Sequence, residues 1–134
     1  MKHLASFAVL VLAASCPLFA DGNDLLKKCA PFVGSVLDGE GLPRDANLTE
    51  KAGDFGFCLG FAQGFTQAHW SIQNAMGKGH SFFCLPKAGI KNGQAIRILV
   101  SYMKAHPEKL QLEEVVLATL AFEEAFPCEG TPRK

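Results

Sequence analysis

The sequence predicts an all-α fold: a small, disulfide-stapled, four-helix bundle-like domain that follows a signal peptide. Apolar residues recur at helical spacing in four segments, and no segment shows the alternation of a strand. Short breaks rich in glycine and proline separate these segments, which favours antiparallel neighbours in an up-and-down order. Four cysteines follow the leader, and an even set is typical of a disulfide-stabilised exported domain.

Residues 1–20 have the features of a cleaved signal peptide. Lys2 precedes an apolar run from Phe7 to Ala14, and the small residue Ala20 precedes the polar sequence DGND. The run is shorter than the about 20 residues that a membrane span requires. A lipoprotein that begins at Cys16 is the less favoured alternative. We therefore expect residues 21–134 to form a single exported domain with no membrane span.

The nearly equal numbers of acidic and basic residues argue against nucleic acid or an anionic membrane as a partner. Without Lys2, the chain has 12 basic and 13 acidic side chains, so its net charge is near −1. A partner such as nucleic acid or an anionic membrane surface calls for a basic patch, which this composition does not indicate.

The first two helices are predicted from periodicity and from helix-end signals. The first runs from about Asp24 to Leu37, and its broad apolar face contains Leu25, Leu26, Cys29, Phe32, Val33 and Val36. Two glycines and a proline in residues 38–47 then predict a loop. The second helix begins after Asn47, a capping residue with Glu50 three positions later, and it extends to about Met76.

The last two helices follow a break at residues 77–89. The third covers about Asn92 to Ala105, with Ala95, Ile98, Leu99, Tyr102 and Met103 inward. It ends at His106, because the residue before Pro107 is pushed out of the helical region. The fourth runs from about Leu110 to Phe126, and its apolar residues are Leu112, Val115, Val116, Phe122 and Phe126.

The four cysteines Cys29, Cys58, Cys84 and Cys128 are predicted to form two disulfides. A zinc site is the competing interpretation, but it would normally show closely spaced cysteine pairs. Sequence alone leaves three pairings open. In an antiparallel bundle Cys29 and Cys58 fall at similar heights, since a helix rises about 1.5 Å per residue. Cys84 and Cys128 lie at one end of the last helical pair, so Cys29–Cys58 and Cys84–Cys128 are favoured.

A row of glycines marks the second helix. Gly56, Gly60 and Gly64 share one helix face, and Phe57, Phe61 and Phe65 lie beside it at the same spacing. Each glycine costs a helix interior about 1 kcal/mol relative to alanine. The favoured explanation is a tightly packed internal seam, in which leucine at Gly60 would overpack the core. The alternative is a face for a second chain, either a copy or a partner.

No pattern of residues indicates catalysis or a cofactor. The motifs GxSxG, HExxH and CxxCH are absent, and a cysteine nucleophile would need a free thiolate. His69 is interpreted as a partly buried helix residue, His80 as an exposed loop residue and His106 as a helix end. We therefore expect neither an enzyme nor a metal or cofactor site.

An ordered set of motifs resembles the Rap/Tai family of periplasmic immunity proteins. The set comprises FCLGFAQG, FFCLP, Gln94, LVSYMKAHPE and LAFEEAFPC, and it covers about Cys29 to Cys128. The scaffold residues that match are Cys58, Gly60, Gly64, Cys84, Pro86, Pro107, Pro127 and Cys128. Phe61 stands where an aromatic, often tyrosine, is usual. Lys91 stands where a Ser or Thr cap is expected, which predicts a weakly capped third helix.

The resemblance implies an all-helical periplasmic protein that often forms a homodimer. Its relatives protect bacteria against type VI secretion amidase effectors, whose active site they bind and occlude. The partner would then be an amidase effector that cleaves peptidoglycan stems and uses a cysteine–histidine pair. The alternative class is a small periplasmic stress or chaperone-like helical protein with no amidase target.

Binding residues are expected on loops that the scaffold holds. The best candidate is residues 75–83, which contain Lys78, His80, Phe82 and Phe83. The two phenylalanines are either exposed anchors for a partner or core residues beside Cys84. Residues 105–111 are the second candidate.

Overall fold

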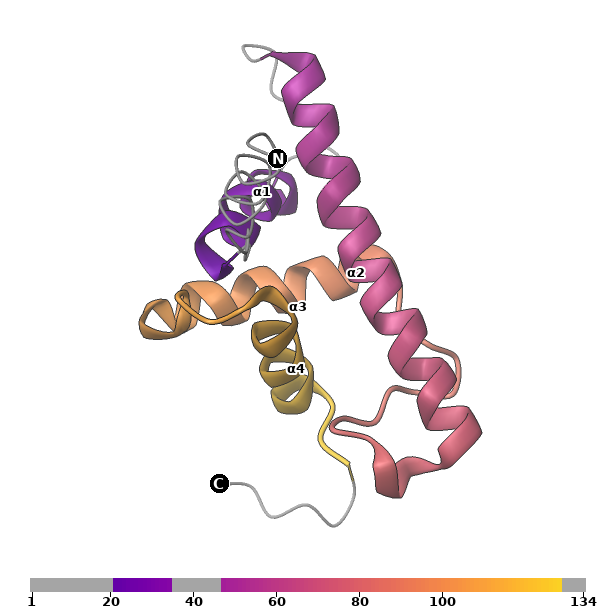
Figure 1. Ribbon diagram of the computed structural model, residues 1–134. Coiled ribbons are helices and arrows are strands. Elements are labelled where there is room, and N and C mark those ends of the chain that lie inside the picture. Colours follow the sequence, from indigo (N-terminus) through magenta and orange to yellow (C-terminus); the bar gives the residue numbers. More distant parts are fainter. Residues whose placement is uncertain (1–20, 35–46, 129–134) are drawn as a thin grey trace, which may run out of the picture.

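The computed structural model describes residues 21–34 and 47–128 (Figure 1). The predicted signal peptide, the alternative at Cys16, the loop of residues 38–46 and the predicted helix end at Leu37 lie outside this range. The elements are α1 (Gly22–Gly34), α2 (Leu48–Met76), η1 (Lys78–His80), α3 (Asn92–Ala105), η2 (Pro107–Lys109) and α4 (Glu114–Ala125). The sole strand-like feature of the described residues is an isolated bridge between Asp21 and Glu113. The all-α prediction is confirmed.

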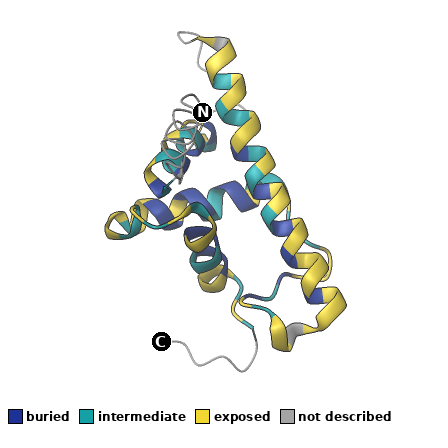
Figure 2. Ribbon diagram, viewed as in Figure 1, coloured by how far each residue is buried: buried dark blue, intermediate teal, exposed yellow. Residues whose placement is uncertain are grey.

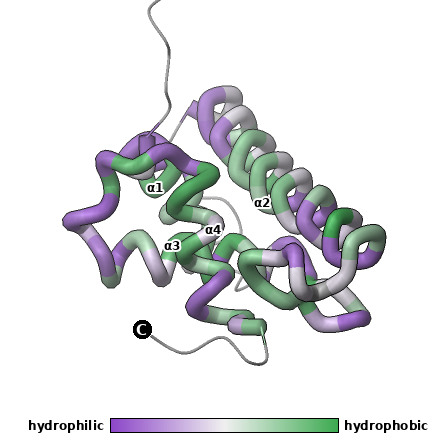
Figure 3. The backbone as a smooth tube through the Cα atoms, turned by 60° about the horizontal axis from the view of Figure 1, so that its bottom comes forward, coloured by the Kyte–Doolittle hydropathy of each residue, from purple (hydrophilic) through white to green (hydrophobic). Residues whose placement is uncertain are grey.

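Helix α3 is the centre of the fold and packs against each of the other three helices. Its buried side chains, which share one broad face of the helix, are Ala95, Ile96, Leu99, Val100, Tyr102 and Met103. In Figure 2 the buried positions of α1, of α4 and of the middle of α2 face this helix. Figure 3 shows apolar residues on the same inner faces. A single core therefore forms around α3.

Helices α2 and α3 cross instead of running side by side (Figure 1). The expected up-and-down order is therefore wrong for this pair. The reason is that residues 77–91 fold back along α2 before α3 begins. Asn92 Nδ2 lies 3.5 Å from Gln63 Oε1, more than three helical turns before α2 ends.

Both predicted disulfides are confirmed. Cys29–Cys58 joins α1 to α2, with a Cα–Cα distance of 5.3 Å, and both residues are fully buried. Cys84–Cys128 joins the segment before α3 to the segment after α4, with a Cα–Cα distance of 4.9 Å. The four helices are thus linked covalently at two places far apart in the sequence.

The helix ends follow the sequence signals in part. Asn47 Oδ1 accepts a hydrogen bond from the Thr49 backbone N–H at 3.3 Å, and α3 has the predicted bounds with no side-chain cap at Lys91. Helix α4 is shorter than predicted, because η2 and a turn occupy residues 107–113. Val115 and Val116, two of its apolar residues, are exposed, since the buried face of α4 consists of Leu117, Ala118, Ala121 and Phe122.

The glycine row of α2 lies on the outside of the protein. Gly56, Gly60 and Gly64 are exposed, and a Cβ added to any of them would meet nothing within 4 Å in the described part of the chain. The buried face of α2 consists instead of Cys58, Ala62, Thr66, His69 and Gln73. The predicted internal seam is therefore wrong, because the helix turns its side-chain-free face away from the core.

The close approach that requires glycine occurs at Gly22, at the start of α1. A Cβ there would overlap Leu117 Cδ1 and would lie 3.0 Å from the Leu110 carbonyl oxygen. The Gly22 backbone N–H donates to the Leu112 carbonyl oxygen at 3.0 Å. The start of α1 is thereby seated against the segment that leads into α4.

Next to this junction, the Glu114 carboxylate is poorly solvated. Its Oε1 atom is buried and makes no hydrogen bond within residues 21–34 and 47–128. Burial, together with the negative charge of Asp24, raises the pKa of Glu114. Lys28 partly offsets this effect, but its ammonium group pairs with Asp24.

No helix within the described residues is both long and apolar enough to cross a membrane.

The two kinds of glycine lead to opposite predictions. Gly22→Ala should destabilise the fold by about 1–3 kcal/mol through overpacking. Gly64→Ala should be neutral or stabilise the protein by up to about 1 kcal/mol, because alanine has a higher helix propensity than glycine at an exposed position within a helix. Urea unfolding of both variants tests this. A Gly22 variant as stable as the parent, or a clearly destabilised Gly64 variant, would contradict the assignment.

Glu114→Gln should raise the melting temperature at pH 7. The folded state disfavours the Glu114 charge, so the parent protein is penalised whenever this group is ionised. The difference should shrink as the pH falls through the raised pKa of Glu114 in the folded state, because the parent then takes up its proton and loses the penalty. Melting curves across this pH range test the sign, and a lower melting temperature for the variant at pH 7 would refute it.

Candidate partner-binding surface

Residues 77–91 join α2 to α3 and contain the predicted binding residues. The segment begins at Gly77, whose φ of 82° lies in the left-handed region that favours glycine. It contains the short helix η1 and then runs as irregular chain to Lys91. The surface therefore depends on what holds this irregular chain against α2.

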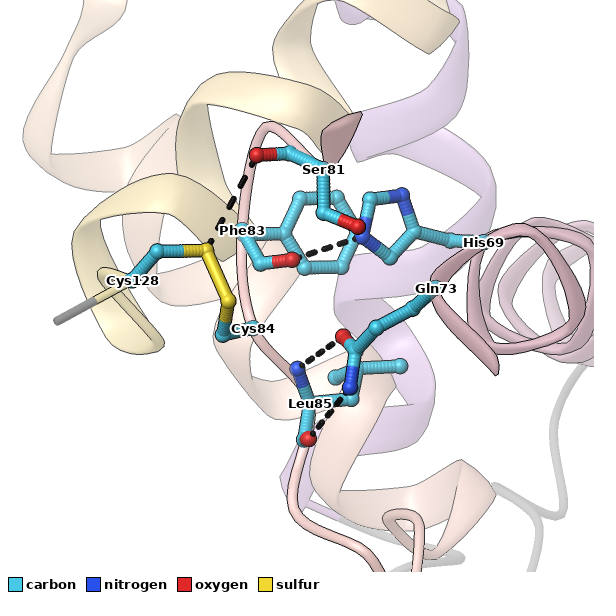
Figure 4. Close-up of a disulfide and its surroundings, with 7 residues drawn as sticks. All are labelled: His69, Gln73, Ser81, Phe83, Cys84, Leu85 and Cys128. Atoms are coloured by element: carbon cyan, nitrogen blue, oxygen red, sulfur yellow. Dashed lines mark hydrogen bonds between the residues drawn. A yellow bond between two sulfur atoms is a disulfide. The ribbon is translucent and has the colours of Figure 1, made fainter. Parts of the chain in front are cut away.

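Gln73 of α2 holds the backbone of Leu85 with two hydrogen bonds (Figure 4). Its Nε2 donates to the Leu85 carbonyl oxygen at 3.1 Å, and the Leu85 N–H donates to its Oε1 at 2.9 Å. Gln73 is buried, and so is Leu85. The side-chain amide thus replaces the backbone partner that an irregular buried segment would otherwise lack.

His69 holds the same segment one helical turn earlier. Its Nε2 lies 2.7 Å from the Phe83 carbonyl oxygen, and its ring stacks on the Phe83 ring at a centroid distance of 3.5 Å. Because a carbonyl oxygen can only accept, His69 Nε2 carries the proton. The prediction of a partly buried helix residue is confirmed, since His69 is buried.

The segment is also tied to the end of α4. The Cys84 N–H donates to the Phe126 carbonyl oxygen at 2.8 Å, beside the Cys84–Cys128 disulfide. Cys128 Sγ lies 3.8 Å from the Ser81 carbonyl oxygen (Figure 4). The backbone of residues 81–85 is therefore fixed from two sides, by α2 and by the chain that follows α4.

This fixation separates the two neighbouring phenylalanines. Phe83 is fully buried and packs against both Phe65 and Phe122, at centroid distances of 5.9 and 5.3 Å. Phe82 points outward and is 73% exposed. Phe83 is thus a core residue, whereas Phe82 is the large apolar side chain that the segment presents to solvent.

The other predicted binding residues lie nearby in sequence. His80 is exposed and its Nδ1 donates to the Met76 carbonyl oxygen at 3.2 Å, which closes the turn after α2. Lys78 lies in η1, and its side chain is outside what the structure describes. Of the second candidate loop, His106 is confirmed as a helix end, where its Nδ1 lies 3.2 Å from Glu108 Oε1.

Trp70 is a candidate that the sequence interpretation missed. It is 41% exposed and lines a small pocket between α2 and residues 85–90. Its position could have been inferred, because Thr66, His69 and Gln73 continue the helical spacing of Cys58 and Ala62, and Trp70 falls on the edge of that face. Ile72 and Met76 are also exposed apolar residues of this end of α2.

Within the residues that the structure describes, no three His, Cys, Asp or Glu side chains are placed to hold a metal ion. The four cysteines of residues 21–128 are all in disulfides.

The fold and this surface together define a small, disulfide-stapled helical domain with an exposed aromatic side chain on a fixed loop. A family of Rap1a immunity proteins matches residues 21–128, and the chain belongs to this family. Neither the curated proteins nor the solved structures contain a match. Membership indicates a toxin-immunity role in which the chain binds an effector, and proteins of this family are generally non-enzymatic.

Gln73→Leu should destabilise the protein by about 1–3 kcal/mol, because it leaves the buried N–H and C=O of Leu85 without partners. Gln67→Leu is the matched control, since Gln67 is exposed on the same helix, and its effect should stay within about 0.5 kcal/mol. Denaturant unfolding measures both. Equal stability of the two variants would show that the Gln73 hydrogen bonds do not hold the segment.

Proposed function

We propose that the chain is a periplasmic immunity protein that binds and occludes a peptidoglycan amidase effector of type VI secretion. Family membership supports the binding role. The observation that supports a particular contact surface is the exposure of Phe82 on a backbone held by Gln73, His69 and Cys84. In this proposal Phe82 is the central contact of the interface.

A fixed aromatic side chain suits this task for a physical reason. Binding energy in protein interfaces concentrates in a few buried anchors, and aromatic residues are prominent among them. An anchor on a fixed backbone loses less conformational freedom on binding than one on a flexible loop. The buried partners of residues 83–85 therefore prepare Phe82 for insertion into a pocket such as an enzyme cleft.

Occlusion needs contacts and no chemistry from this chain. The effector would supply the catalytic cysteine and histidine, while the cysteines of the immunity protein are used in disulfides. These disulfides are consistent with an oxidising compartment outside the cytoplasm. A signal peptide over residues 1–20 and a periplasmic location complete the proposal, and Phe82 would then meet the effector where peptidoglycan is cut.

Phe82→Ala should weaken effector binding about 30-fold or more, the loss expected for a hot-spot residue of at least 2 kcal/mol. Val115→Ala is the control, because Val115 is an exposed apolar residue of α4, and it should leave affinity unchanged. The assay is a pull-down of the domain against the amidases of competing secretion systems, followed by calorimetry and a peptidoglycan cleavage assay.

The outcomes separate the alternatives. An amidase that is captured and silenced by the parent, and far less by the Phe82 variant, supports the whole proposal. Capture that is insensitive to Phe82 keeps the immunity role and excludes this contact. No capture of any amidase favours the alternative of a periplasmic stress or chaperone-like protein. The homodimer implied by the family resemblance is a separate prediction, which sedimentation of the isolated protein tests.

A further inference from the structure

The pocket beside Trp70 has the size of a single side chain. Its volume is about 160 Å³, and it lies between Thr66, Gln67 and Trp70 of α2 and residues 85–90 of the following segment. Pockets for small-molecule ligands usually hold about 300–1,000 Å³. A cavity of about 150 Å³ accommodates a group of the size of benzene. The pocket therefore fits one apolar side chain of a partner.

The walls of this pocket are mostly apolar, and two of them are held by hydrogen bonds. Leu85 is held by Gln73, and a turn closes the opposite wall, where the Gly89 N–H donates to the Pro86 carbonyl oxygen at 2.8 Å. Gly89, the last residue of this turn, has a φ of 70°, which favours glycine at that position. The Thr66 hydroxyl already donates to the Ala62 carbonyl oxygen at 2.8 Å. The hydroxyl proton of Thr66 is therefore already used within α2 and is not available to a side chain that enters the pocket.

The charged side chains along this part of the sequence are all basic. Among the residues that line the pocket, Lys87 is the charged one, and its side chain is exposed. Residues 55–107 contain no Asp or Glu, but they contain Lys78, Lys87, Lys91, Arg97 and Lys104. This asymmetry is pronounced in a chain whose overall formal charge is zero.

The nearest acids along the two adjoining helices are far from the pocket. Asp54 precedes Trp70 by 16 positions, about 24 Å along α2. Glu108 follows the far end of α3, and Glu124 of α4 lies 3.7 Å from His106 Nε2 at that same end. Since charges more than about 10 Å apart are largely screened in salt, Lys87 and its neighbour Lys91 set the field at the pocket among the residues that the structure describes.

We propose that the pocket formed by Trp70, Lys87 and Ile90 is a second docking site, which takes an apolar side chain from an acidic segment of a partner protein. The apolar side chain fills the pocket between α2 and the Pro86–Gly89 turn, while flanking carboxylates pair with Lys87. Where that partner is the effector, the inference rests on the proposed function. The pocket and Phe82 would then both belong to one segment that Gln73 and Cys84 hold in place.

The sequence contains a single tryptophan, Trp70, so its fluorescence reports on this pocket alone. The probes are three capped pentapeptides: Asp-Asp-Phe-Asp-Asp, the same peptide with Ala in place of Phe, and Lys-Lys-Phe-Lys-Lys. We expect a saturable change in Trp70 emission with the first peptide. The dissociation constant should be at least tenfold weaker for each of the other two. Added salt should weaken binding of the first peptide.

Two charge-reversal variants make the test specific. Lys87→Glu should weaken binding of the acidic phenylalanine peptide at least tenfold. Lys104→Glu carries the same change at the far end of α3, and its affinity should stay within twofold of the parent. Equal binding of the acidic and basic peptides, equal affinity of the two variants, or no saturable signal would overturn the inference. No effector is used in this test. A failure here would therefore not contradict the proposed function, which the Phe82 experiment tests separately.

Discussion

The paired hydrogen bonds between Gln73 and the backbone of Leu85 are the constraint on which the functional surface depends. Residues 81–90 have no regular secondary structure, so their buried backbone groups need partners from elsewhere. Gln73 supplies both for Leu85, and His69 supplies one for Phe83. With these contacts, Phe83 enters the core, whereas Phe82 in the same bend points outward and is 73% exposed. The exposed anchor is thus a consequence of buried polar contacts.

The glycine row and the polar residues of α2 complement each other. The inner face changes along the helix from small apolar residues at Cys58 and Ala62 to polar residues at Thr66, His69 and Gln73. The first part packs on the core, whereas the second part holds an irregular segment. The outer face carries Gly56, Gly60 and Gly64 with open space above them. These glycines cost helix propensity and gain no packing among the described residues. The disulfide to α1 and the core contacts must offset that cost.

Much of the fold could be predicted from the sequence, and the failures have identifiable causes. Helix α3 was predicted with its correct bounds because His106-Pro107 gives a strong stop signal. The disulfide pairing followed from the similar heights of Cys29 and Cys58 along their helices and from the position of Cys84 and Cys128 at one end of the last helical pair. Periodicity could not show which way the glycine face turns, because both faces of α2 are rich in small and apolar residues. It also could not assign Val115 and Val116, since α4 is apolar nearly all round.

The candidate site was predicted only in part. Residues 75–83 were chosen for their position in a loop, which is how Phe82 was found, yet the choice between Phe82 and Phe83 depends on tertiary contacts of His69. Amide hydrogen exchange of the native domain tests the central claim most directly. The account predicts that the Leu85 N–H exchanges as slowly as core amides of α3, although it lies in irregular chain. Exchange at the rate of an unstructured peptide would contradict it, because the hydrogen bonds from Gln73 would then not fix the segment that presents Phe82.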